Sequence, residues 1–352
     1  MNYTDKTHEA VQLLKQLVAT PSLSREEEEA ADLIQQYLQT KGYEPVRKGN
    51  NVWSKCKAFN ESLPTILLDA HIDTVKPVAG WTHDPFVPEE TTDGVIYGLG
   101  TNDDGASLVS MMQAFFLIDE MGGNSSYNLI FLASCEEEVS GKNGIESIIP
   151  ILPPIYFAIV GEPTNMQPAI AEKGLMVIDV TTEGVSGHAA RNEGVNAIYK
   201  AIEDIRWIET HQFSKSSELL GPVKTTVTII QAGTQHNVIP DRCQFTIDVR
   251  SNECYTNQEI FDEIANNLQG KAVARSFRLN SSSINPTHPF VQKAISLGLT
   301  PFGSPTLSNQ ALMPFPSIKI GPGNSARSHT ADEYIKIEEI TQAINLYYRL
   351  LS

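Results

Sequence analysis

The sequence predicts an α/β protein: a mixed, mostly parallel sheet with helices on both faces, interrupted by an inserted ferredoxin-like α+β domain. Three apolar runs, Ile66–Leu68, Asn128–Ala133 and Ile155–Val160, show little polar alternation, which is typical of strands buried on both faces. Beyond Gly174, apolar and polar residues alternate instead, as in strands with one exposed face. This change of pattern indicates a second domain.

Two amphipathic helices are predicted before the first buried strand. Residues 7–19 place their apolar side chains on one helical face. Ser24 is followed three residues later by Glu27, a capping-box pattern that predicts the start of a second helix running through Leu38. The acidic run Glu26–Glu29 suits the positive N-terminal end of that helix, so we interpret it as a solvated first turn and not as part of a site.

A glycine-containing turn follows the first buried strand. Residues 98–105 lead into a predicted helix at 107–121. The turn matches neither GxGxxG nor GxxxxGK(S/T), and no phosphate-contacting lysine follows, so we reject a phosphate-binding loop. Its glycines instead allow a sharp bend that presents Asp103 or Asp104 beside the start of the helix.

The second domain is predicted from the order of its elements. Strands are expected at 176–180, 225–230, 244–250 and 273–278, and helices at 195–209 and 257–268. This β-α-β-β-α-β order is the ferredoxin-like plan. The polar segment 280–286 has the composition of a return linker, after which a strand at 317–321 and a helix at 337–351 resume the first domain. The predicted organisation is a first domain in two parts, 1–173 and 285–352, with 174–284 inserted.

Composition excludes several classes of function. The 352 residues carry 42 acidic and 26 basic side chains, a formal net charge of −16, which argues against nucleic-acid binding because that needs a basic face. The four cysteines form no CxxC pair, so reduced thiols are expected. The N-terminus lacks an apolar signal region, and no apolar run is long enough to span a membrane. We therefore expect a cytoplasmic protein.

Imidazole and carboxylate groups follow the predicted strands where each strand ends. His71 and Asp73 follow the first, Glu136–Glu138 the second and Glu162 the third. Parallel strands place these ends at one edge of the sheet, where α/β sheets bind ligands, and adjacent carboxylates there repel unless a cation neutralises them. A solvated acidic surface is the alternative. With His329 and an aspartate of the glycine turn, this set suits two zinc ions, or cobalt or manganese, about 3.5–4 Å apart.

Six separated motifs resemble the zinc aminoacylase and carboxypeptidase family, which includes acetylornithine deacetylase and succinyl-diaminopimelate desuccinylase. The motifs, in order, are His71-x-Asp73, Gly98-x-Gly100 with Asp103, Glu136–Glu138, Gly161-Glu162-Pro163-Thr164, Gly187-His188 and Ser328-His329. They span nearly the whole chain. The chain departs from the family at Leu99, where Arg is frequent, and at Gly105, where Lys is common. The resemblance implies a zinc-peptidase-like catalytic domain with two Zn²⁺ ions, and a ferredoxin-like lid that pairs two subunits into a homodimer.

The resemblance also implies roles for single residues. The implied metal ligands are His71, Asp103 as the bridge, Glu138, Glu162 and His329. Asp73 would orient the His71 imidazole. Glu137 would be the catalytic base that takes a proton from the attacking water and passes it to the leaving amine. A one-residue slip, with Glu136 as the base and Glu137 as the ligand, stays open as the alternative.

Three residues of the inserted domain are implied in substrate binding. His188 would reach the partner subunit's site and donate to the tetrahedral oxygen, Arg250 would clamp a substrate carboxylate, and Asn237 would add a hydrogen bond. The alternatives are a loop histidine without a role for His188 and a surface ion pair for Arg250.

The implied activity is hydrolysis of the amide bond of a small N-acyl-L-amino acid. N-acetylornithine or N-succinylornithine, converted to ornithine in arginine biosynthesis, is the expected substrate. Succinyl-diaminopimelate desuccinylase and a dipeptidase or carboxypeptidase are alternatives that share the chemistry. A non-catalytic metal- or peptide-binding protein on the same scaffold is the alternative from a different class.

Overall fold

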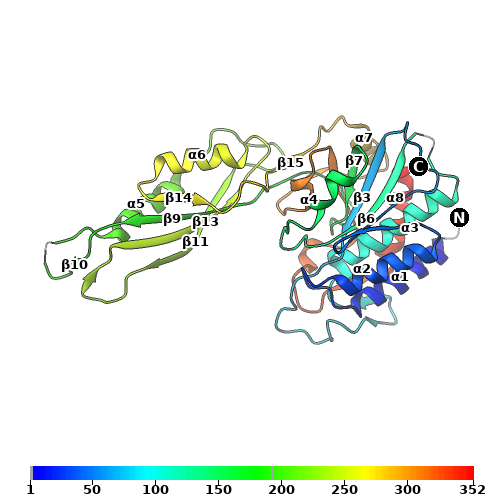
Figure 1. Cartoon of the computed structure of the whole chain (residues 1–352), viewed down its shortest axis with the longest axis horizontal. Helices are drawn as coiled ribbons and strands as arrows, with labels where there is room; N and C mark the ends of the chain where they lie inside the picture. Colours follow the sequence, from blue (N-terminus) through cyan, green and yellow to red (C-terminus); the bar gives the residue numbers. More distant parts are fainter. Residues whose placement is uncertain (1–2, 125, 192) are drawn as a thin grey trace. The chain divides into compact units, whose positions relative to one another are not determined.

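The computed structural model describes residues 3–124, 126–191 and 193–352, which form two compact units (Figure 1). Unit 1 comprises Met1–Ile170, Ile284–Phe302 and Ser308–Ser352, and unit 2 comprises Ala171–Ser283 and Gly303–Leu307.

The helices are α1 (Tyr3–Val18), α2 (Glu28–Thr40), α3 (Ala106–Glu120), α4 (Ile145–Ile148), α5 (Ala197–Thr210), α6 (Asn257–Asn267), α7 (Pro289–Ser296) and α8 (Ile337–Leu351). The strands are β1 (Val46–Lys48), β2 (Asn51–Lys55), β3 (Thr65–His71), β4 (Glu89–Glu90), β5 (Val95–Tyr97), β6 (Asn128–Ser134), β7 (Ile155–Val160), β8 (Ala169–Glu172), β9 (Met176–Glu183), β10 (Gly187–His188), β11 (Lys224–Ala232), β12 (Val238–Ile239), β13 (Arg242–Arg250), β14 (Lys271–Ala274), β15 (Ser282–Ser283), β16 (Phe302–Ser304), β17 (Ser317–Lys319) and β18 (Tyr334–Lys336).

The central sheet of unit 1 is mixed, as predicted, with parallel strands at its centre. Its strands follow the order β1-β2-β6-β3-β7-β17-β8. The inner pairs β6–β3, β3–β7 and β7–β17 are parallel, whereas the pairs toward the edges are antiparallel. Every residue of β3 and β6 is buried, which explains their unbroken apolar sequence. Because β3 and β6 run parallel, their carboxyl ends bring His71 opposite Ser134 and next to the Glu136–Glu138 segment.

Helices cover both faces of this sheet. On one face α1, α3 and α8 pack together (Figure 1), and α3 is buried around nearly its whole circumference. On the other face Leu67 and Ile130 pack against Ile145 and Ile148 of α4. The strands whose ends carry the predicted ligands are therefore packed between two apolar layers.

We expect Phe131→Ala to reduce the free energy of unfolding by about 3–5 kcal/mol, because it deletes a large side chain from a packed interior. Phe131 lies on β6, is completely buried, and has its ring centroid 6.1 Å from that of Phe115. Chemical denaturation measures the loss. Met121→Ala is the control: this side chain is 64% exposed, and the expected change is within about 0.5 kcal/mol. Equal losses in the two variants would contradict the described core.

Unit 2 is a four-stranded antiparallel sheet with helices on one face. The strand order is β11-β13-β9-β14, and α5 and α6 contribute Ala197, Ala201, Ile260 and Ile264 to its core. The chain order of these elements is β-α-β-β-α-β, the ferredoxin-like plan. The last strand is β14, Lys271–Ala274, and so ends earlier than the predicted segment 273–278.

The beginning of α2 differs from the prediction. The helix starts at Glu28, with Glu27 at its N-cap position and no side-chain cap. Ser24 instead donates its hydroxyl to Asp73 Oδ2 at 2.7 Å. Glu27 is completely buried, so the interpretation of the whole run Glu26–Glu29 as a solvated turn is wrong at this residue. Donors from other segments of the chain satisfy its carboxylate.

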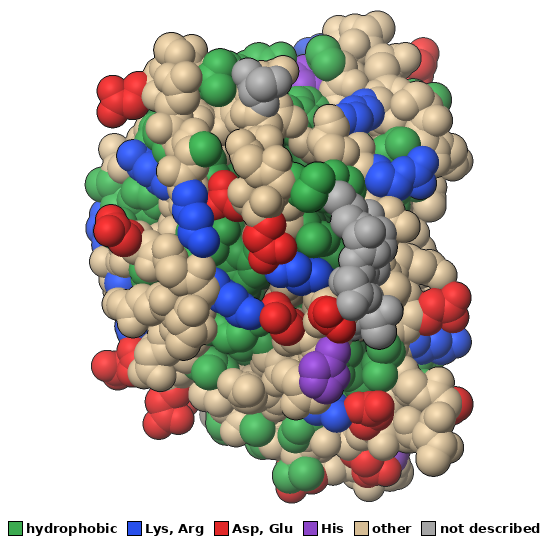
Figure 2. Space-filling view, turned by 90° about the vertical axis from the view of Figure 1, so that its right-hand side faces the viewer, with side chains coloured by type: hydrophobic (Ala, Val, Ile, Leu, Met, Phe, Trp, Pro, Cys, Tyr) green, Lys and Arg blue, Asp and Glu red, His purple; other side chains and the backbone are tan. Residues whose placement is uncertain are grey.

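Charged side chains of both signs lie on the surface. Figure 2 shows one face of the molecule, on which acidic and basic side chains are interspersed among hydrophobic and polar ones. Among the residues that the structure describes, no helix is both long and apolar enough to cross a membrane. All four cysteines are free thiols.

Candidate metal centre

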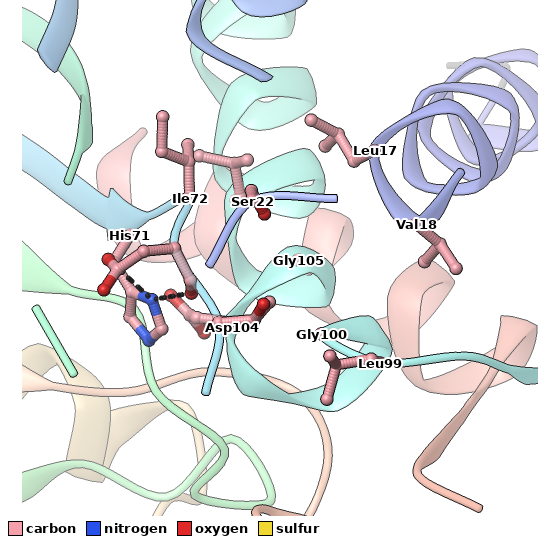
Figure 3. A pocket seen from close by; sticks show the side chains of 12 residues that line it. Leu17, Val18, Ser22, His71, Ile72, Leu99, Gly100, Asp104 and Gly105 are labelled. Carbon is pink, nitrogen blue, oxygen red and sulfur yellow. Dashed lines mark hydrogen bonds and ion pairs between the residues drawn. The ribbon is translucent and has the colours of Figure 1, made fainter. Parts of the chain in front are cut away.

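The centre begins at His71, the last residue of β3, which is 2% exposed. Its Nδ1 lies 2.8 Å from the backbone carbonyl of Asp73 and 3.6 Å from Asp73 Oδ1 (dashed lines in Figure 3). A carbonyl oxygen only accepts, so Nδ1 carries the proton in this hydrogen bond. In the neutral ring the lone pair is then on Nε2. Asp73 thus fixes both the orientation and the tautomer that a metal-binding imidazole requires.

The carboxylate of Asp103 lies between two imidazoles. Its Oδ1 is 3.2 Å from His71 Nε2, and its Oδ2 is 3.7 Å from His329 Nε2. The two histidines are distant in sequence and belong to different segments of unit 1, Met1–Ile170 and Ser308–Ser352. Asp104 has its Oδ2 near Gly161 instead, where a side-chain Cβ would come within 2.6 Å. Of the two aspartates, Asp103 is therefore the one whose carboxylate lies between the imidazoles.

The three glutamates after β6 point in different directions. Glu138 Oε2 is 3.0 Å from His329 Nε2, and Glu137 Oε2 is 4.0 Å from His71 Nε2. Glu136 instead accepts from the side-chain amide of Asn143 at 2.8 Å. This arrangement favours the register in which Glu137 and Glu138, and not Glu136, face the centre.

Two overlapping sets of donor atoms are close enough to hold cations. One set is His71, Asp103 and Glu138, and the other is His71, Glu137 and Glu162; within each set the donor atoms lie within 4.8 Å of one another. All five sequence-predicted ligands therefore meet at one place, because His329 joins through its contacts with Asp103 and Glu138. Imidazole nitrogens and carboxylate oxygens are the donor types that zinc, cobalt and manganese accept.

The electrostatics of the centre also call for a cation. Burial, with repulsion from Glu138, Asp73 and Asp103, raises the pKa of Glu137 well above its usual value. Burial and neighbouring carboxylates likewise raise the pKa of Glu162, although the charge of Lys319 opposes the rise. Without a cation, these raised pKa values favour protonated carboxyl groups. Divalent cations would take the place of those protons and relieve the repulsion between the carboxylates. The residues present thus fit a dinuclear metal centre.

Metal affinity should fall as the pH decreases. Although burial lowers the pKa of His71, its hydrogen bonds to Asp103 and Asp73 raise that pKa well above the ordinary value. A cation needs the unprotonated Nε2, so binding displaces a proton below this raised pKa. We expect Co²⁺ affinity to weaken by up to about tenfold per pH unit for each proton released, as the pH is lowered below this raised pKa. Calorimetric titration checks this, and an affinity independent of pH would contradict it.

A small cavity adjoins the centre on the side of α1. Its volume is about 20 Å³, and Figure 3 shows His71, Asp104, Leu17 and Leu99 around it. That volume holds about one water molecule. The cavity is therefore too small for a substrate.

The predicted substrate-binding residues all lie in unit 2. His188 on β10 pairs with Val238 on β12, and the backbone carbonyl of Asn237 accepts from Ala189 at 3.0 Å. His188 and Asn237 are thus neighbours on one ladder. Arg250, at the end of β13, donates to both carboxylate oxygens of Asp248 at 2.9 and 3.2 Å, the ion pair that the sequence left as the alternative.

Two acids that hold the ligand-bearing turns were not expected from the sequence. Glu333 is 2% exposed, and its Oε1 accepts from the backbone N–H groups of Asn102 and Asp103 at 2.8 and 3.0 Å. No local pattern in the sequence distinguishes it, because both of its partners lie about 230 positions away. Glu27 is the second such acid, because it accepts from the backbone N–H of Glu136 at 3.2 Å.

Comparison with known proteins agrees with the architecture. The family model described as peptidase family M20/M25/M40 matches residues 67–352. The chain is 28% identical over 374 residues to acetylornithine deacetylase of Proteus mirabilis (strain HI4320), covering 97% of this chain and 95% of the relative.

Solved structures share the fold at lower identity. A tripeptidase from Staphylococcus aureus subsp. aureus Mu50 superimposes with a TM-score of 0.78 at 20% identity, covering 98% of this chain and 97% of that one. A dinuclear metal-binding peptidase of the M20 family from Bacillus subtilis gives 0.75 at 17% identity, covering 99% and 98%. The chain is a metal-dependent hydrolase that belongs to peptidase family M20/M25/M40.

Proposed function

We propose that this protein hydrolyses the amide bond of a small N-acyl-L-amino acid, N-acetylornithine or N-succinylornithine, to release ornithine in arginine biosynthesis. The observation that carries the proposal is the placement of one carboxylate, Asp103, between His71 and His329, with Glu137 beside them. The likeness to acetylornithine deacetylase along nearly the entire chain supports this substrate class.

In the proposed mechanism, His71, Asp103, Glu138, Glu162 and His329 hold two cations, which we propose to be Zn²⁺. When bound, such cations polarise an amide carbonyl and make a water molecule more acidic. Glu137 accepts a proton from the attacking water and donates it to the nitrogen of the leaving amine. Its side chain is 10% exposed, so the carboxyl group works in a site largely closed to bulk water, where its proton transfer is protected.

Unit 2 supplies the remaining parts of the proposal. We propose that residues 174–284 act as a lid domain and pair two subunits into a cytoplasmic homodimer. His188 and Asn237, neighbours on the β10–β12 ladder, would contact the substrate. Arg250 would bind a substrate carboxylate by exchanging its partner Asp248 for the ligand, because a guanidinium holds either carboxylate in the same bidentate geometry.

A hydrolysis panel tests the function. The purified protein, with Zn²⁺ or Co²⁺ added, is assayed on N-acetylornithine, N-succinylornithine, succinyl-diaminopimelate and simple dipeptides. We expect ornithine release from one of the first two at a higher kcat/KM than for the others. Chelation should abolish this activity and cation addition should restore it. Preference for succinyl-diaminopimelate or for dipeptides would reassign the substrate, and no hydrolysis by metal-loaded protein would favour a binding protein.

A further inference from the structure

Four consecutive backbone N–H groups after β6 donate to side chains from distant parts of the chain. Cys135 donates to Asn51 Oδ1 at 3.1 Å, and Glu136 donates to Glu27 Oε1 at 3.2 Å. Glu137 and Glu138 donate to Oδ1 and Oδ2 of Asp73 at 3.0 and 3.1 Å. We call this segment, 135–138, the glutamate turn. Its course is set by side-chain acceptors instead of by a strand or a helix.

The three acceptor side chains are Asn51, Asp73 and Glu27, and each residue is completely buried. Asp73 also contacts His71, so its place is explained by the metal centre. Glu27 is different: within the described residues its hydrogen bonds go to Arg25, Asn50 and Glu136, none of which is a proposed ligand. Burying a carboxylate costs free energy unless its oxygens accept hydrogen bonds. The donors to Glu27 therefore show which parts of the chain it holds together.

Glu27 joins three segments of unit 1. Its Oε1 accepts from the backbone N–H groups of Arg25, at 2.6 Å, and of Glu136; its Oε2 accepts from the amide of Asn50 at 2.9 Å. Arg25 and Glu136 both have positive φ, at 77° and 55°. Residues other than glycine adopt this conformation only where surrounding contacts enforce it. Oε1 of Glu27 thus accepts hydrogen bonds from the backbone N–H groups of both positive-φ residues.

The next residues leave little room for the turn to shift. Glu136 turns its carboxylate away from the metal centre, toward Asn143. A Cβ on Gly141 would come within 1.8 Å of Glu136 Oε2, so the Glu136 side chain lies in close contact with the backbone at Gly141. If Glu136 rotated, Glu137 and Glu138 would rotate with it, because backbone rotation at a positive-φ residue redirects the residues that follow.

We propose that Glu27 is a positioning residue: it fixes Glu136 in its turned-away conformation and thereby aims Glu137 and Glu138 at the metal centre. This proposal rests on the proposed function for the roles of Glu137 and Glu138. It concerns the register of the glutamate turn, which the sequence left open by one residue.

Kinetics of three variants test the proposal. Glu27→Ala removes the acceptor, and we expect kcat to fall about 10–100-fold, as for residues that orient a metal centre, while KM changes less than about threefold. Glu27→Asp keeps the charge but is too short to reach both N–H groups, so it should behave like Glu27→Ala. Glu27→Gln keeps a carbonyl oxygen of the right length, and Asn50 can rotate its amide to accept from the new NH₂, so most of kcat should return.

Glu29→Ala is the matched control, because Glu29 is an exposed glutamate in the same helical turn; its kcat should equal that of the unaltered protein. Thermal unfolding is measured on each variant. The proposal is wrong if Glu27→Ala lowers the melting temperature but leaves kcat unchanged, or if Glu27→Asp restores kcat and Glu27→Gln does not. If Glu27→Ala does not fold, the contrast between the Asp and Gln variants decides.

Co²⁺ binding provides a readout that needs no substrate. Because Glu138 is a proposed ligand, Glu27→Ala should weaken Co²⁺ affinity about 10–100-fold and alter the visible spectrum of the bound ion, whereas Glu27→Gln and Glu29→Ala should not. If the unaltered protein hydrolyses no member of the panel, the proposed function fails, and these affinities still judge the role of Glu27. Identical Co²⁺ affinities in all variants would overturn the proposal.

Discussion

Glu137→Ala should lower kcat by about 10²–10⁴-fold while the protein keeps its full metal content, because the substitution removes the group that transfers the proton and leaves the proposed ligands in place. Glu137 lies 4.0 Å from His71 Nε2 and within reach of Glu162, so it faces the reacting region. Steady-state kinetics give kcat, and elemental analysis gives the number of metal ions per chain.

Two further variants make this result specific. Glu61→Ala replaces an exposed glutamate of unit 1 and should leave kcat unchanged. Glu136→Ala distinguishes the two registers: the structure predicts a smaller loss than for Glu137→Ala, because Glu136 contacts Asn143 and not the centre. A larger loss for Glu136→Ala, or loss of metal in Glu137→Ala, would assign the base to Glu136.

Asp103→Asn should reduce the bound metal from two ions to at most one and abolish measurable turnover, because the amide offers one weak oxygen ligand where the carboxylate offers two. Metal content and Co²⁺ titration measure the effect. Asp93→Asn, at an exposed position where the carboxylate bonds only locally to Thr91, is the control and should bind two ions.

The metal-free form of the same variant supplies a second measurement. The hydrogen bond to Asp103 is the leading cause that raises the pKa of His71 against the effect of burial. With that charge removed, the His71 pKa should fall, and the imidazole should be neutral over a wider pH range. NMR titration of the imidazole checks this. An unchanged His71 pKa and two retained metal ions would show that Asp103 is not the bridge.

The sheet, and the gathering of imidazole and carboxylate groups at one edge of it, were predictable because both follow from short-range patterns. The apolar run before His71 predicts a buried strand. Because His71, Glu138 and Glu162 each follow such a strand, they are expected to lie close together at the carboxyl edge of the sheet. The choice of Asp103 over Asp104, and the separate roles of Glu137 and Glu138, came instead from the resemblance to a known family. The three-stranded sheet β4-β5-β18 was missed because strands of two or three residues show no period.

The residues that support the centre were not predictable in this way. The spacing of Ser24 and Glu27 satisfies a capping box, yet in the structure Ser24 bonds to Asp73 and Glu27 bonds to Glu136, more than 100 positions away. Nothing local distinguishes these partners. Glu333 likewise has distant partners: its carboxylate accepts from the backbone N–H groups of Asn102 and Asp103. Acids that act by accepting backbone hydrogen bonds across the fold leave no pattern in a single sequence.

Anomalous X-ray scattering from crystals of the zinc-loaded protein is the most direct test of the central claim. We predict two peaks at the zinc absorption edge, about 3.5–4 Å apart, one beside His71 and the other beside His329, with the Asp103 carboxylate between them. A single peak, or peaks remote from both imidazoles, would contradict the dinuclear centre on which this account depends.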